Sequence, residues 1–123
     1  MPIQALVEDL RGTIAAFPGT SWASGGTDEE GEHQVAWVKF GATKSEAGWR
    51  TIEFISWLYT DMSRGGEHVL LFPTAPPPYL NEPGECLSFV LEVHADGDLQ
   101  PRLQRVIDFV RQCKADYWAE CAP

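Results

Sequence analysis

Residues 86–94 read CLSFVLEVH, and this stretch decides the fold class of the chain. Apolar and more polar side chains alternate along it, which is the pattern of a β-strand with one buried face. The face expected to be buried carries Leu87, Phe89, Leu91 and Val93. The stretch therefore predicts an antiparallel sheet that is covered on one side, with a turn at Asp96-Gly97.

Two amphipathic helices are predicted at the ends of the chain. Residues 99–119 carry an apolar stripe at helical spacing, with Asp98 as the N-cap and Pro101 in the first turn, where proline is tolerated. Residues 3–17 carry a second stripe, which ends at Pro18-Gly19. Because a striped helix buries its apolar side against another element, we expect both helices on the apolar face of the sheet.

The middle of the chain is less clear. Residues 34–41 and 67–73 read as strands, and residues 18–33 as a loop in which a short strand around Trp22 is left open. Residues 49–60 are rich in β-branched and aromatic side chains, which favours a strand, although Ile52, Ile55 and Tyr59 also fit a helical stripe that Ser45 could cap. We choose a strand. The four prolines of residues 74–85 predict an extended loop.

These segments predict one α+β domain over all 123 residues. An N-terminal helix precedes a four-stranded antiparallel meander, and a C-terminal helix follows it. Both helices pack on one sheet face, which gives a two-layer sandwich.

The charge of the chain favours a basic partner. Eighteen acidic and nine basic residues give a formal charge of −9, of which residues 1–98 carry −10 and the rest +1. This sign repels nucleic-acid phosphates and anionic membranes, so we expect neither as a partner. Attraction to a basic protein is the hypothesis, and solubility is the plainer interpretation.

The compartment is predicted from the ends of the chain and its cysteines. Glu8 and Asp9 stand where a signal peptide would have basic and then apolar residues, and no apolar run reaches the length of a membrane span. The three cysteines form no CxxC pair, which is typical of reduced thiols. A cytoplasmic location is therefore expected.

Catalytic and cofactor motifs are not found. The glycine pairs lack the pattern of phosphate-binding loops, and the histidines are 35 and 26 residues apart without metal-ligand spacing. His68 and His94 fall on neighbouring predicted strands near Glu92, but isolated strand histidines are usually solvated. Acidic neighbours disfavour a thiolate at Cys86. We predict no metal and no cofactor, and an enzyme is the less favoured class.

A partner-binding face is the main functional expectation. If residues 49–60 form a strand, Trp49, Glu53, Trp57 and Tyr59 share one side, while the other side is also apolar. Either the sheet is covered on both faces, or the second side contacts a partner or a ligand. Because aromatic residues are enriched at binding hot spots, we choose a partner. The acidic turn adds Asp28, Glu29, Glu30 and Glu32.

The leading hypothesis is thus a protein-binding module for a basic partner, of the kind found in immunity-type inhibitors or secretion chaperones. The alternative is a small-molecule-binding protein or enzyme with a pocket between the sheet and residues 74–85.

Overall fold

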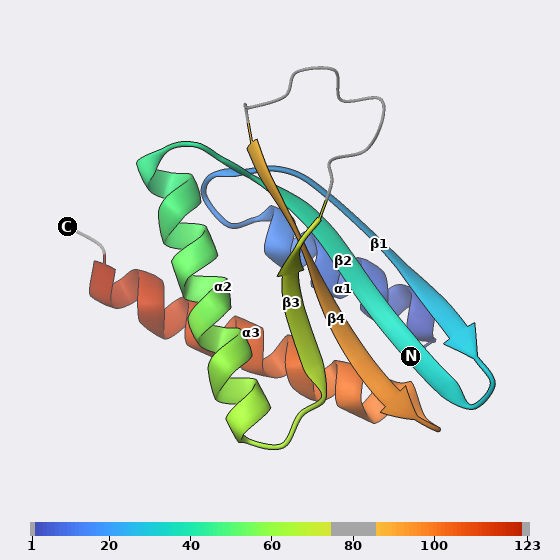
Figure 1. Cartoon of the computed structure of the whole chain (residues 1–123). Coiled ribbons are helices and arrows are strands. Elements are labelled where there is room, and N and C mark those ends of the chain that lie inside the picture. The colour runs from blue at the N-terminus through green and yellow to red at the C-terminus, as the bar shows by residue number, and fades with distance from the viewer. Residues whose placement is uncertain (1, 75–85, 122–123) are drawn as a thin grey trace.

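A computed structural model describes residues 2–74 and 86–121, with side chains described for 2–74 and 87–115. In chain order the elements are α1 (Ile3–Ala15), β1 (Thr20–Glu30), β2 (His33–Thr43), α2 (Glu46–Arg64), β3 (Val69–Pro73), β4 (Cys86–Asp96) and α3 (Leu99–Cys121) (Figure 1). The four strands form one antiparallel sheet. The predicted α+β class, with a helix at each end and four antiparallel strands between, is confirmed.

The order of the strands across the sheet is β1-β2-β4-β3. It departs from a simple meander because β4 lies between β2 and β3. The sheet therefore has two unequal edges: β1 has 11 residues, whereas β3 has five and ends on Pro73, which has no N–H to donate.

The strand predicted over residues 49–60 is wrong, because these residues belong to α2. The helix forms because it buries Phe54, Ile55, Leu58 and Met62 on one side, and of the three stripe residues noted in the sequence only Ile55 is fully buried. Ser45 caps the helix, and its hydroxyl accepts a hydrogen bond from the Gly48 N–H at 3.2 Å. The β-propensity of aromatic and branched residues is a weak preference that this burial outweighs.

The loop predicted over residues 18–33 is also largely wrong, since β1 occupies most of it. β1 pairs with β2 from Trp22, opposite Gly41, to Glu30, opposite His33. The glycines of this hairpin have a packing role. A Cβ at Gly41 would lie 2.2 Å from Nε1 of Trp22, and one at Gly26 would lie 2.4 Å from a ring carbon of Trp37. Each tryptophan therefore covers a glycine on the neighbouring strand.

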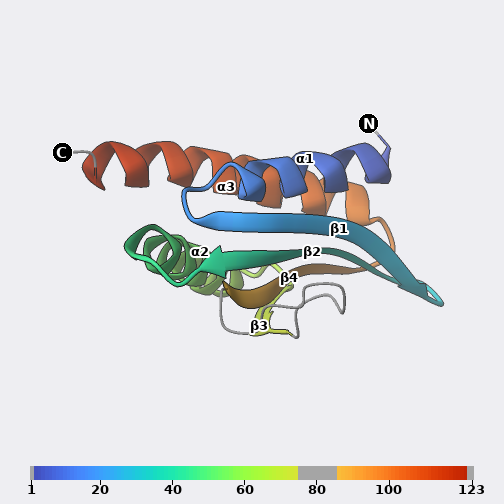
Figure 2. The same cartoon turned by 90° about the horizontal axis from the view of Figure 1, so that it is seen from above.

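All three helices share one core with one face of the sheet. Figure 2 shows α1 and α3 lying together along one side of the strands. Among the side chains predicted to be buried on β4, Leu91 and Val93 are buried, while Phe89 packs against the core and stacks on Phe40 at 5.9 Å between ring centroids. The predicted layer arrangement is confirmed, and the opposite sheet face is turned away from the helices.

Candidate functional site

The face of the sheet turned away from the helices, called here the second face, brings together residues that are far apart in sequence. Residues opposite each other in an antiparallel register share a face, so the pairing defines rows of side chains across it. From the β1–β2 turn inward, the rows are Glu30–His33–Asp96, Asp28–Val35–His94 and Gly26–Trp37–Glu92–Leu70. Carboxylates and histidines therefore occupy one end of this face, and aromatic and apolar side chains follow.

A continuous chain of side-chain hydrogen bonds crosses the first rows. Nδ1 of His33 lies 2.7 Å from a carboxylate oxygen of Asp96, and Nε2 of His33 lies 2.9 Å from Nδ1 of His94. Nε2 of His94 lies 2.9 Å from a carboxylate oxygen of Glu92. Two imidazoles thus stand in series between two carboxylates, and we call this set the histidine chain.

The third histidine, His68, packs on this chain without joining it through its side chain. Its ring stacks on that of His94 at 4.7 Å between centroids, and its backbone carbonyl accepts a hydrogen bond from the His94 N–H at 2.8 Å. Sequence reasoning placed His68, His94 and Glu92 near one another. It missed His33, because residues 18–33 were read as a loop and the β1–β2 register was not foreseen.

Asp96 is exposed, but the charge of its carboxylate is stabilised. The hydrogen bond from His33 lowers the pKa of Asp96 below its ordinary value, and the charges of His33, His68 and Arg102 add to this effect. The carboxylate therefore remains ionised at neutral pH and into mild acid.

This shift predicts a pH dependence of stability. A depressed pKa in the folded state adds stability that is present above the unfolded value of 3.8 and lost as the pH falls through the folded pKa. We expect the wild type to have a higher thermal midpoint than Asp96→Asn at neutral pH. This difference should shrink below about pH 4, where the Asp96 carboxylate is neutralised. A difference that grows in acid would contradict this assignment.

Six exposed carboxylates gather around the two turns at this end of the sheet, which we call the acidic end. They are Asp28, Glu29, Glu30, Glu32, Asp96 and Asp98. The two turns are tied together, since the Gly97 N–H donates to the Glu32 carbonyl at 3.0 Å. The four acidic residues singled out in the sequence are thus neighbours, and the structure adds two more from the β4–α3 turn.

The aromatic residues singled out in the sequence lie elsewhere. On α2, Trp49, Glu53 and Trp57 follow one another at intervals of four residues and form one exposed ridge, called here the tryptophan ridge. The two indoles are 54% and 53% exposed. Tyr59 does not belong to the ridge, because it packs against the core. The second face has aromatic residues of its own, including Trp37 and the exposed Phe72.

The acidic end and the tryptophan ridge are well separated. Figure 1 shows the β1–β2 turn and α2 at opposite sides of the molecule. A strand rises about 3.3 Å per residue, so the 11 residues of β2 that run between them span roughly 30 Å or more. A partner that contacts both surfaces must therefore be at least the size of a small domain.

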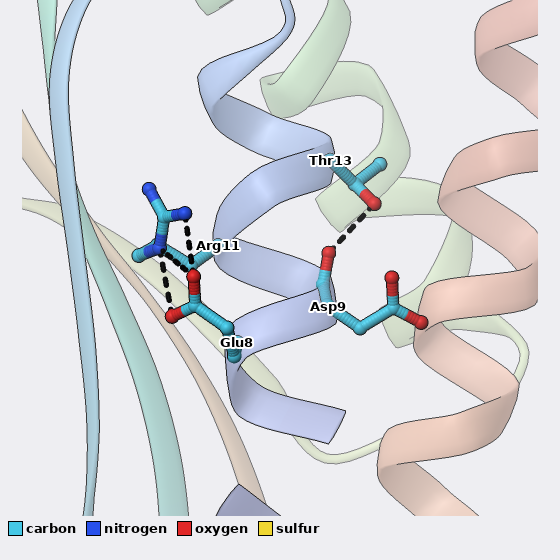
Figure 3. Close-up of polar contacts among 4 residues, drawn as sticks. All are labelled: Glu8, Asp9, Arg11 and Thr13. Carbon is cyan, nitrogen blue, oxygen red and sulfur yellow. Dashed lines mark hydrogen bonds and ion pairs between the residues drawn. The ribbon is translucent and has the colours of Figure 1, made fainter. Parts of the chain in front are cut away.

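Two grooves lie between helices, and each is lined by an ion pair. A groove of about 590 Å³ between α1 and α3 is lined by Glu8 and Arg11, which form an ion pair at 2.6 Å, and by Asp9, which pairs with Arg111. Figure 3 shows Arg11 turned to the Glu8 carboxylate, whose pKa this contact lowers, and the Thr13 hydroxyl donating to the Asp9 carbonyl. These pairs satisfy one another, and Lys114, which also lines the groove, has its Nζ 4.8 Å from the ring centroid of Phe17.

A second groove, of about 630 Å³, lies between the end of α2 and α3. Glu67 occupies it and binds Arg105 at 2.8 Å. The pocket predicted between the sheet and residues 74–85 lies outside the described residues.

Comparison with known proteins gives no match. No protein-family model, curated protein or solved structure matches the chain. Within residues 2–74 and 86–121, none of the helices is both long and apolar enough to cross a membrane. Nor do the described side chains contain a group of three or more that could hold a metal ion. The absence of a metal and of a cofactor stays a prediction.

Proposed function

We propose that this chain is a cytoplasmic binding module for a basic protein, with the acidic end as its recognition surface. The observation that supports the proposal most is the gathering of six exposed carboxylates around two adjoining turns. A surface of one sign attracts a partner of the opposite sign over a distance of about one Debye length and raises the association rate. An immunity-type inhibitor or a secretion chaperone would be typical of this size and charge.

The tryptophan ridge supplies the second part of the proposal. Two half-exposed indoles on one rigid helix are candidates for hot-spot residues, because tryptophan buries a large area with few rotatable bonds. In this arrangement the acidic end raises the association rate of the partner, and the tryptophan ridge lowers its dissociation rate.

The experiment separates these two roles. A partner is captured from the native cytoplasm and identified, and its association and dissociation are followed by stopped-flow or surface-plasmon kinetics. Converting Asp28, Glu29, Glu30 and Glu32 to their amides should lower the association rate about tenfold or more. The same change should make the association rate less sensitive to salt. In the wild type, raising the salt from about 0.1 M to about 1 M shortens the Debye length from about 10 Å to about 3 Å and so weakens the steering that the variant already lacks. Trp57→Ala should cost about 2 kcal/mol, roughly 30-fold, mainly in dissociation.

A matched variant controls for net charge. Converting the exposed Glu8, Glu46, Asp61 and Asp108 to amides removes the same number of charges outside both the acidic end and the tryptophan ridge. This variant should retain most of the association rate. The proposal would be contradicted if both charge variants lost the association rate equally, or if the captured partner were acidic. It would also be contradicted if Trp57→Ala and the acidic-end variant both bound normally.

One observation supports the small-molecule alternative. Nε1 of Trp22 and Oγ of Ser88 are buried without a hydrogen-bond partner within the described residues, and both side chains flank Gly41 on the second face. Buried donors of this kind suit an acceptor group of a ligand. If Trp22→Phe and Ser88→Ala abolish binding while the acidic-end variant binds normally, the alternative replaces the proposal.

A further inference from the structure

The histidine chain fixes the number of protons that it can hold. Its three hydrogen bonds need three hydrogens. Ionised carboxylates only accept, so the hydrogens must come from the ring nitrogens of His33 and His94. Nδ1 of His33 must donate to Asp96, and Nε2 of His94 must donate to Glu92. The third hydrogen must lie between the two rings, on Nε2 of His33 or on Nδ1 of His94.

Two neutral imidazoles carry only two hydrogens in total, so the complete chain holds one additional proton. With one proton fewer, two nitrogen lone pairs face each other at 2.9 Å, or a lone pair faces a carboxylate. With one proton more, two N–H groups and two positive charges meet at the same contact. All three hydrogen bonds can therefore form in only one protonation state of the two rings. Removing a proton or adding one breaks at least one of these hydrogen bonds.

Charged groups from several elements surround the two rings. On β4, Glu92 and Asp96 flank the two rings, and on β1 Glu30 lies directly opposite His33. His68, in the segment before β3, stacks on His94. Its neighbour Glu67 has a carboxylate oxygen 3.9 Å from a guanidinium nitrogen of Arg102 on α3. The charge of Arg102 also lowers the pKa of Asp96. The His94 side chain is only 13% exposed, so these charges act on it with less screening than on the surface.

We propose that His33 and His94 hold one shared proton and act as a pH-sensitive clasp of the acidic end. The clasp joins the start of β2 to the end of β4, and so fixes Asp96 beside the β1–β2 turn. Its control of partner binding rests on the function proposed above, whereas the shared proton does not. An ordinary imidazole gains and loses its proton between about pH 5 and pH 8, and this range is therefore the one in which the proposal is tested.

The first test is nuclear magnetic resonance of the full chain with ¹⁵N-labelled histidines and a metal chelator. Long-range ¹H–¹⁵N spectra are recorded from about pH 5 to about pH 8. In the middle of this range, three of the four ring nitrogens of His33 and His94 should carry hydrogen, and both rings should titrate together in coupled steps. His68→Gln, which removes the stacked ring but no hydrogen bond of the chain, should preserve this coupling. Independent single-site curves, or two neutral rings throughout, would overturn the proposal.

The second test measures the coupling free energy between the two rings. Unfolding is followed for the wild type, His33→Gln, His94→Gln and the double variant at several pH values. The coupling should pass through a maximum and decline toward both acid and alkali. A coupling that is independent of pH, or a zinc ion found on the pair by native mass spectrometry, would refute the shared proton. Neither readout needs the partner, so a failure here is distinct from a failure of the proposed function.

Discussion

Replacing Phe54 with alanine is expected to lower the free energy of unfolding by about 3–5 kcal/mol. Phe54 is 1% exposed in the middle of α2, and its ring packs edge to face on that of Phe17 at 5.4 Å between centroids. Truncation removes the buried ring and leaves a cavity where α2 meets the end of α1. Small domains are stable by about 5–15 kcal/mol, so this loss is a large fraction of the total. Urea denaturation followed by circular dichroism measures it.

The neighbouring residue provides the control. Glu53 precedes Phe54 on the same helix but is exposed, so Glu53→Ala should change stability by no more than about 0.5 kcal/mol. If Phe54→Ala does not fold, Phe54→Leu keeps most of the buried volume and should cost less than about 1.5 kcal/mol. A cost below about 1 kcal/mol for Phe54→Ala would show that α2 does not bury this side of the helix.

A second large effect is expected at Gly48, in the first turn of α2. A Cβ here would lie 1.8 Å from the carbonyl oxygen of Thr43. Because the obstacle is backbone, no change of rotamer can relieve it, and the start of α2 must move. Gly19, which has a φ of +83°, closely approaches the same turn, and its carbonyl accepts from the Thr43 N–H at 2.8 Å. Gly48→Ala should therefore cost about 3 kcal/mol or more in unfolding free energy.

Gly12 provides the control, because the same substitution there should change stability in the opposite direction. It lies inside α1, and a Cβ there would meet nothing within 4 Å. Gly12→Ala should therefore stabilise the protein by about 0.5–1 kcal/mol, since alanine is the better helix former. Opposite signs for the same substitution in two helices can be measured by chemical denaturation. A gain in stability at Gly48 would show that the contact with Thr43 is absent in solution.

The sequence predicted those parts of the fold that have a single strong periodicity. The alternation of residues 86–94 and the stripes of residues 3–17 and 99–119 each match one structure, and the structure confirms them. Residues 49–60 satisfy two patterns at once. The choice between them depended on whether Phe54 and Leu58 would find a core to fill, and this is a tertiary property that local composition does not contain.

The candidate site was less predictable because it depends on register. Two residues of β1 that looked flexible, Gly25 and Gly26, belong to a strand because Trp37 covers one of them. Without β1, the alignment of Glu30, His33 and Asp96 in one row could not be foreseen. The exposed carboxylates of the β1–β2 turn were identified because an acidic run at a turn signals exposure in any register.

The long outer edge of β1 has a consequence for the behaviour of the protein in concentrated solution. An unpaired strand edge is a template for pairing with another copy, and β1 carries no proline and no lysine that would block this. The short β3 edge, which ends on proline, is much less exposed to the same hazard. Three successive carboxylates, Asp28, Glu29 and Glu30, act as gatekeepers of the β1 edge through mutual repulsion between copies. Replacing all three with their amides removes this protection, so the variant should aggregate edge to edge at protein concentrations at which the wild type stays in solution.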